Sequence, residues 1–169
     1  SILEVDPENI DIMMQYGSFE MATENYVRAV RCYDNVLRID ATNAKAMEAL
    51  ARAEDKLGNT AQVKYWLEQG LAVDPETTKL LKRLSLIYLN EQNYQLTVHY
   101  LDRLLEIDPH NAGAHRNRGI AFYQQGEKKR AIESFEAVRT NGGKMEGLYG
   151  PLADCYRSTR QSKKALEII

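Results

Sequence analysis

A period of 34 residues runs through this chain of 169 residues without an insertion. Its clearest markers are Asp-Pro pairs that place Pro7, Pro75 and Pro109 at multiples of the period, while Asp40-Ala41 stands at the interval that lacks a proline. A fixed period of about 20 to 50 residues indicates an array of stacked structural units. The period therefore predicts a fold in which each unit packs mainly against its neighbours.

Taking Ile10 as position 1 divides the chain into consecutive units. Residues 1–9 form the tail of a preceding unit, and the following units cover residues 10–43, 44–77, 78–111, 112–145 and an incomplete 146–169. We expect these units to form one continuous repeat domain, and we expect the chain to be a fragment of a longer protein.

Within each unit, apolar and small residues recur at two sets of helical positions, the first at 3, 4, 7, 8, 10 and 11 and the second at 20, 24, 27 and 28. Position 8 is small in every unit, which allows two helices to approach closely: Gly17, Ala51, Ser85, Gly119 and Ala153. Gly58 and Gly126 fall between the two sets, and Asp-Pro follows the second. Each unit is thus predicted to be a pair of helices, which makes the fold class all-α.

These columns resemble the tetratricopeptide repeat family, whose 34-residue signature is best matched by Leu84, Ser85, Tyr88, Tyr94, Leu101 and Pro109. The resemblance covers the whole chain. It implies a right-handed superhelical solenoid of antiparallel helix pairs, with a concave groove that holds peptides.

Five positions depart from the family pattern: Glu20, Glu54, Arg118, His115 and Gly143. The first four are expected to weaken local packing. Gly143 replaces a proline and introduces a glycine-rich stretch that is unfavourable inside a helix. The first helix of the last unit is therefore expected to start late, with Pro151 in its first turn and a flexible seam before it.

Residues with catalytic chemistry do not converge in the sequence. The histidines fall on an exposed helix side (His99), in a loop (His110) and in a core column (His115), and no glycine-rich phosphate-binding motif is present. We expect no enzyme activity, no cofactor and no metal site. Cys32 and Cys155 are expected to be buried free thiols.

The overall charge is nearly balanced, with 22 Lys and Arg against 24 Asp and Glu, a formal net charge of −2. This balance gives no bias toward nucleic acid. The longest uncharged stretch is the ten residues from Gln92 to Leu101, whereas a spanning helix needs about 20 apolar residues. We expect neither a nucleic-acid partner nor direct membrane insertion; the residues do not indicate a cellular compartment.

The face formed by positions 2, 5, 9, 12 and 13 of the first helices corresponds to the concave groove of the family. Its middle combines cations with apolar side chains, namely Lys79, Lys82, Leu86, Leu89, Arg116, Ile120 and Tyr123. Such a mixture favours a peptide with acidic and apolar residues as the partner. The alternative is an ordinary solvated helix face.

Two subtypes of the family can be compared with this face. A carboxylate clamp uses five residues, of which only Lys79 and Arg83 are present. A second subtype carries an asparagine at position 6 of its units, and here that column holds Gln15, Ala49, Arg83, Asn117 and Pro151. The sequence therefore predicts a non-catalytic interaction scaffold without assigning it to either subtype.

A rival interpretation is a structural or self-associating module. Leu166, Ile168 and Ile169 are apolar at the C-terminal end, where a repeat array needs a polar cap. A third interpretation is the adaptor part of a larger assembly or enzyme.

Overall fold

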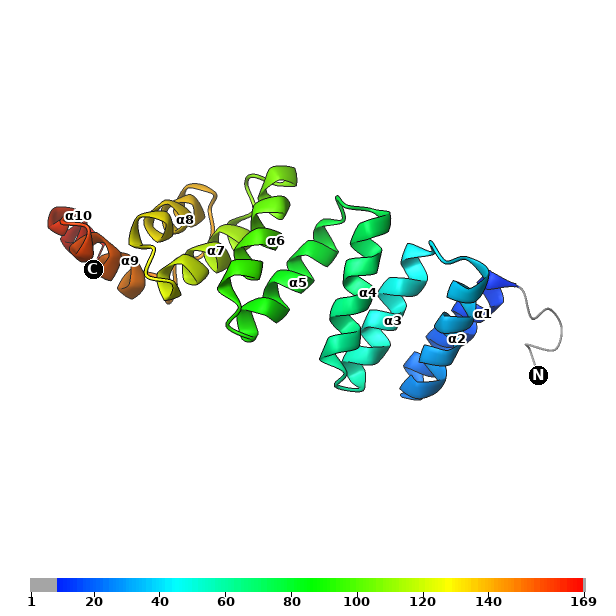
Figure 1. The fold of residues 1–169 in the computed structure, drawn as a ribbon. Coiled ribbons are helices and arrows are strands. Elements are labelled where there is room, and N and C mark those ends of the chain that lie inside the picture. Colours follow the sequence, from blue (N-terminus) through cyan, green and yellow to red (C-terminus); the bar gives the residue numbers. More distant parts are fainter. Residues whose placement is uncertain (1–8, 169) are drawn as a thin grey trace. The chain divides into compact units, whose positions relative to one another are not determined.

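The computed structural model describes residues 9–168, and this part of the chain contains ten α-helices and no strand. Figure 1 shows these helices, coloured along the sequence. Their bounds are α1 Ile10–Ala22, α2 Tyr26–Ile39, α3 Ala44–Lys56, α4 Thr60–Val73, α5 Thr78–Asn90, α6 Tyr94–Ile107, α7 Ala112–Gln124, α8 Lys128–Thr140, α9 Tyr149–Ser158 and α10 Ser162–Glu167. The predicted tail at residues 1–9 and the end residue Ile169 lie outside the described residues, except for Asn9.

Asparagine side chains cap the start of several helices. The side-chain oxygens of Asn9, Asn43 and Asn111 accept hydrogen bonds from backbone N–H groups in the first turns of α1, α3 and α7. Each cap satisfies one of the N–H groups that have no partner within the helix. Two turns between helices place Gly58 and Gly126 at φ values of +79° and +76°, which glycine adopts at little cost.

Aspartates end three of the second helices. Asp40, Asp74 and Asp108 are the C-cap residues of α2, α4 and α6. The Asp40 carboxylate accepts hydrogen bonds from the Thr42 hydroxyl and N–H groups, and these bonds lower the pKa of Asp40. The recurring aspartates are therefore turn residues.

The chain divides into two compact units, one ending at Leu80 and the other beginning at Leu81, so that the boundary falls within α5. In the first unit α2 packs against both α1 and α3, and α3 against α4. A cluster of Ala29, Tyr33, Ala49, Leu50 and Ala53 forms a core there. The close approach predicted at position 8 is present, because a Cβ added to Gly17 would lie 2.5 Å from the Tyr33 ring.

In the second unit α7 packs between α6 and α8, and α9 packs against α8 and α10. Its largest buried side chains include Phe135, Leu148 and Leu152. Gly119 repeats the role of Gly17, since an added Cβ would lie 2.5 Å from the Phe135 ring. The same column thus sets the helix spacing in both units.

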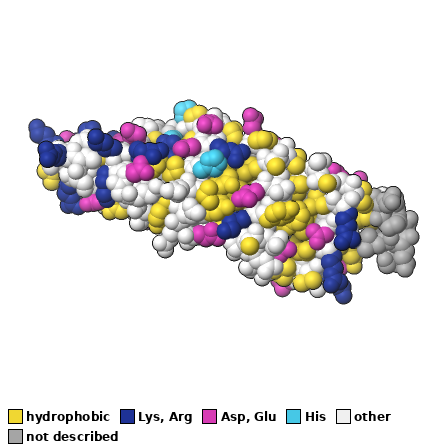
Figure 2. Space-filling view, viewed as in Figure 1, with side chains coloured by type: hydrophobic (Ala, Val, Ile, Leu, Met, Phe, Trp, Pro, Cys, Tyr) yellow, Lys and Arg dark blue, Asp and Glu magenta, His cyan; other side chains and the backbone are white. Residues whose placement is uncertain are grey.

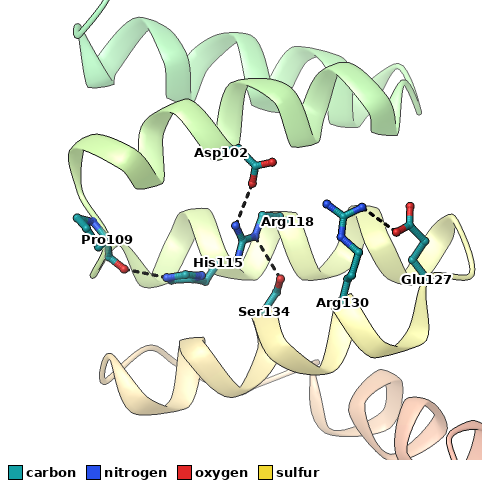
Figure 3. A network of polar contacts seen from close by, with 7 residues as sticks. All are labelled: Asp102, Pro109, His115, Arg118, Glu127, Arg130 and Ser134. Carbon is teal, nitrogen blue, oxygen red and sulfur yellow. Dashed lines mark hydrogen bonds and ion pairs between the residues drawn. The ribbon is translucent and has the colours of Figure 1, made fainter.

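Arg118 does more than interrupt an apolar column, as Figure 3 shows. Its guanidinium donates to the Asp102 carboxylate at 2.9 Å and to the buried Ser134 hydroxyl at 3.2 Å. These bonds join α7 to both α6 and α8. The residue that was expected to weaken packing instead supplies a polar connection among three helices.

Three of the other departures, Glu20, Glu54 and His115, are buried. Glu54 accepts a hydrogen bond from Asn59 at 2.6 Å, and His115 bonds to the Pro109 carbonyl at 2.9 Å, as Figure 3 shows. Glu20 is 2% exposed, and its Oε2 atom has no hydrogen-bond partner among the described residues. Among the described residues, two buried side-chain atoms have no hydrogen-bond partner: Glu20 Oε2 and His115 Nδ1.

The late start of the last unit is confirmed. α9 begins at Tyr149, and Pro151 is its third residue. Residues 141–148 form the loop that connects α8 to α9, and in this loop Gly142 and Gly147 have φ values of +70° and +76°. A Cβ at Gly143 would lie 2.7 Å from both Ala112 and Val138. Glycine here allows the loop to pass close to α7 and α8.

Both cysteines are buried and free, as predicted, and burial raises the pKa of each thiol. Among the described residues no group of three or more His, Cys, Asp or Glu is arranged to hold a metal ion. None of the ten described helices is long and apolar enough to cross a membrane.

Candidate peptide-binding surface

Two helices of the second unit present matching stripes of side chains. Lys82, Leu86 and Leu89 recur on α5 at intervals of one helical turn, and Arg116, Ile120 and Tyr123 do so on α7. Residues with this spacing share one face of a helix. We call these six residues the α5/α7 stripe. On each of the two helices, the set begins with a cation and continues with two apolar or aromatic residues.

The apolar members of the α5/α7 stripe differ in exposure. Leu86 is 38% exposed, whereas Leu89 is half-buried. Ile120 and Tyr123 are half-buried and pack against the core cluster of the second unit. The α7 part of the stripe therefore offers an apolar surface that rests on the core of the second unit.

Tyr123 is held by neighbours from α8 and α9. The Lys128 ammonium lies 3.8 Å from the centre of the Tyr123 ring and 2.9 Å from the Asp154 carboxylate. Burial, together with a hydrogen bond to Asp154, raises the pKa of Tyr123. The hydrogen bond from Lys128 lowers the pKa of Asp154, so this carboxylate stays charged at neutral pH. The network thus connects Tyr123 on α7 to α8 and α9.

Arg116 is tied to the loop between α8 and α9. Its two terminal nitrogens donate to the backbone carbonyl oxygens of Lys144 and Glu146, at 2.9 and 2.7 Å. The loop expected to be a flexible seam is thus fastened to α7 by a side chain of the predicted site. The hydrogen bonds orient the guanidinium without neutralising its charge.

A hollow of about 650 Å³ lies beside Arg116. Four of its lining residues are alanine or glycine, and the complete lining is Ala112, Gly113, Arg116, Val138, Gly143, Lys144, Glu146 and Gly147. Small residues create the space, and Arg116, Lys144 and Glu146 are the charged residues of its lining. The hollow therefore extends the α7 part of the stripe.

Lys79 belongs to the first unit and behaves differently from the cations of the stripe. It is exposed and forms an ion pair with Glu48, which lies on α3. A carboxylate of the chain therefore already compensates its charge. Lys82 is exposed on the same helix beyond the unit boundary.

Charged side chains of both signs lie along the middle of the face drawn in Figure 2. Along the middle of the chain, Lys and Arg side chains alternate with Asp and Glu, and hydrophobic side chains lie between them. This agrees with the small net charge of −2.

The sequence-based reasoning missed several residues that shape this surface. Glu48 is the partner of Lys79, Lys128 and Asp154 hold Tyr123, and the loop carbonyls of Lys144 and Glu146 bind Arg116. The spacing of 31 residues between Glu48 and Lys79 was available as a signal, because it joins position 5 of one unit to position 2 of the next. The loop contacts had no comparable signal.

Comparison with protein families gives one match. The model of the tetratricopeptide repeat matches residues 84–140, which lie in the second unit and include most of the α5/α7 stripe.

Several solved structures share the fold. The crystal structure of YrrB, described as a TPR protein with an unusual peptide-binding site, is 21% identical with a TM-score of 0.79, over 98% of this chain and 86% of that one. The crystal structure of MamA is 19% identical with a TM-score of 0.79, and the match covers 94% of this chain and 87% of that one. MamA from Desulfovibrio magneticus RS-1 is 15% identical with a TM-score of 0.75, over 94% and 90%. The predicted all-α repeat fold is thereby confirmed.

Proposed function

Because the chain belongs to the tetratricopeptide repeat family, we propose that it is a non-catalytic scaffold that binds a peptide segment of another protein along the α5/α7 stripe. The segment carries apolar and acidic side chains. We also propose Lys79, in the first unit, as a contact for a peptide.

The observation that carries this proposal is the exposure of Leu86 at 38% next to the apolar side chains of the stripe. An exposed apolar patch flanked by cations is typical of a protein-interaction site. The description of YrrB as a TPR protein with a peptide-binding site supports the same class of ligand.

The apolar and charged residues have different roles in this proposal. Burying apolar surface contributes roughly 25 cal/mol per Å², so Leu86, Leu89, Ile120 and Tyr123 supply most of the affinity. Exposed ion pairs are each worth about 0.2 to 1 kcal/mol. Lys82 and Arg116 therefore set mainly the orientation of the peptide and its rate of association.

The experiment selects peptides from a randomised phage-displayed library on the whole chain and measures the affinity of the selected peptides. Leu86→Ala is expected to weaken binding about fivefold, which corresponds to the loss of roughly 1 kcal/mol of apolar contact. Ile107→Ala is the matched control, because Ile107 is 40% exposed on α6 of the same unit and lies outside the stripe. Equal effects of both variants would refute the proposed surface.

Two charge-reversal variants, one inside and one outside the stripe, test the role of its cations. Lys82→Glu is expected to slow association and to flatten its salt dependence, because it removes an attractive charge from the stripe. Lys129→Glu makes the same change of charge at an exposed position of α8, and it is expected to leave association nearly unchanged. If the selected peptides show no preference for acidic sequences and Lys82→Glu leaves association unchanged, the ligand is not acidic.

Self-association is a second candidate function, favoured by Leu166, which is 78% exposed on α10. Of the other two apolar residues predicted at this end, Ile168 is half-buried and Ile169 lies outside the described residues. Measuring mass at several protein concentrations tests this candidate. A concentration-dependent dimer that Leu166→Asp abolishes would support it, and a monomer at all concentrations would refute it.

A further inference from the structure

We infer that the hollow beside Arg116 is a carboxylate-binding subsite. It receives an acidic side chain or the terminal carboxylate of the bound peptide. This inference rests on the proposed function, because it assigns one contact within the peptide-binding surface.

The repeat register provides the first argument. In the first unit, Glu48 at position 5 of one repeat pairs with Lys79 at position 2 of the next. The same spacing of 31 residues joins Arg116 to Gly147, and a Cβ added to Gly147 would lie 3.6 Å from the Arg116 Nη2 atom. In both pairs, the residue at position 2 of one repeat lies next to the residue at position 5 of the preceding repeat. Lys79 supplies a charged side chain at position 2, whereas Gly147 has no side chain.

The chain itself cannot readily fill this position. Gly147 has a φ of +76°, a conformation that side-chain-bearing residues rarely adopt. Gly113 also lines the hollow and contributes no side chain. The space where a charged partner would lie is therefore open to a ligand.

The charge of Arg116 is the second argument. Two of its five N–H donors are used by the carbonyl oxygens of Lys144 and Glu146. Within residues 9–168, no carboxylate forms an ion pair with Arg116. Glu146 is the only acid among the lining residues, and it offers Arg116 its backbone carbonyl. A ligand carboxylate would supply the missing charge, with Lys144 as a second cation nearby.

The position of the hollow fits the apolar part of the stripe. Ile120 follows Arg116 by one turn of α7, a rise of about 5.4 Å. A peptide bound along α7 can therefore place a carboxylate in the hollow and a neighbouring apolar side chain on Ile120. The ligand class is an acidic residue flanked by apolar residues.

Nuclear magnetic resonance on the whole chain tests this inference with short probes. The probes are the tripeptide acetyl-Leu-Glu-Leu-amide, its Gln counterpart, acetyl-Leu-Leu with a free terminal carboxylate, and acetyl-Leu-Leu-amide. The backbone amides of Gly113 and Gly147 report on the hollow, since both line it. We expect the Glu tripeptide to shift both amides at millimolar concentration and the Gln tripeptide to shift them about fivefold less at the same concentration.

Two variants of one residue separate charge from volume. Residues 113 and 116 lie three apart on α7, so Gly113→Glu places a carboxylate within reach of Arg116. We expect Gly113→Glu to weaken binding of the Glu tripeptide about fivefold by competing with it. Gly113→Gln adds the same volume without the charge and is expected to have a much smaller effect.

Each result has a definite reading. A response to acetyl-Leu-Leu that its amide lacks would identify a terminal carboxylate as the natural group, and a response to the Glu tripeptide alone would identify a side chain. Equal responses to the Glu and Gln tripeptides, no response at Gly113 and Gly147, or equal weakening by both variants would overturn the carboxylate subsite. Shifts at Leu86 and Leu89 with both tripeptides would in that case leave the proposed function intact.

Discussion

Single residues set the spacing of the helices, and Gly119 shows this most clearly. It lies on α7 in the column where all five repeats hold a small residue. An added Cβ would lie 2.5 Å from Phe135 Cε1 and 2.6 Å from Cδ1, and Phe135 is completely buried. The ring therefore has little freedom to move away.

We predict that Gly119→Ala destabilises the fold. A clash this short places the packing cost near the upper end of the usual range, about 3 kcal/mol, and the helix-propensity gain of about 1 kcal/mol offsets only part of it. The net loss in free energy of unfolding is expected to be about 2 kcal/mol, measured by urea denaturation. Gly113→Ala on the same helix is the control; its added Cβ meets its nearest atom at 3.4 Å. A stabilised Gly119→Ala variant would contradict the packing account.

The two thiols give a second prediction at this scale. Cys32 and Cys155 are buried, and burial raises the pKa of each. Because the thiolate is the reactive form, we predict slow labelling of both by a thiol reagent at neutral pH until denaturant is added. A Ser158→Cys variant, at an exposed position, is expected to label at once. Immediate labelling of Cys32 and Cys155 in the native protein would contradict their placement.

At the scale of elements, helix pairs depend on polar contacts as well as on apolar packing. The Tyr156 hydroxyl on α9 donates a hydrogen bond to the Glu136 carboxylate on α8 at 2.7 Å. Burial is the largest cause, and this bond the next, of a rise in the pKa of Tyr156 from 10.0 to about 12. The contact joins the late-starting α9 to the preceding helix.

This contact predicts a loss of stability at alkaline pH. Between about pH 10 and pH 12 the native state keeps the Tyr156 proton, whereas the unfolded state loses it. Stability contributed by Tyr156 is thus complete below pH 10 and decreases as the pH rises toward 12. Tyr156→Phe is expected to lose about 1.5 kcal/mol at neutral pH and to show a weaker decrease above pH 10 than the parent chain.

Denaturation midpoints measured across this pH range test the prediction. Tyr149→Phe is the matched control, because Tyr149 lies on the same helix and is 49% exposed. Parallel alkaline curves for the parent chain and Tyr156→Phe would refute the role of this hydrogen bond.

The helices themselves were predictable from the sequence, and many of their polar contacts were not. Asn43 and Asn111 come directly before the periodic apolar residues of α3 and α7, and Gly58 and Gly126 come shortly after these helices. Local residue types therefore mark where α3 and α7 begin and end. The late start of α9 followed from Pro151. The bonds from Arg118 to Asp102 and Ser134 depend on the packing of three helices, which no local pattern encodes.

The candidate site was predictable only in part. The spacing placed Lys82, Leu86 and Leu89 on one helix face, because helical periodicity is a property of the sequence. The contacts of Arg116 depend on the path of the loop between α8 and α9, which is set by Gly142, Gly143 and Gly147. Loop paths follow from tertiary packing, so the sequence did not reveal the hollow.

At the scale of the whole molecule, the same pair of repeat positions has different roles in different repeats. The same register that closes a charge pair between Glu48 and Lys79 leaves Arg116 beside Gly147. A repeat array can therefore keep its fold while single columns change the surface it presents. On this account, binding specificity lies in the exposed columns and stability in the buried ones.

The most direct test of the central claim is a map of backbone amide shifts over the whole chain when a library-selected peptide is added. We predict that the largest shifts fall on α5 from Lys82 to Leu89, on α7 from Arg116 to Tyr123, and on the loop from Gly143 to Gly147. Shifts concentrated instead on α6 and α8, with the α5/α7 stripe unchanged, would contradict the proposal that this stripe is the peptide-binding surface.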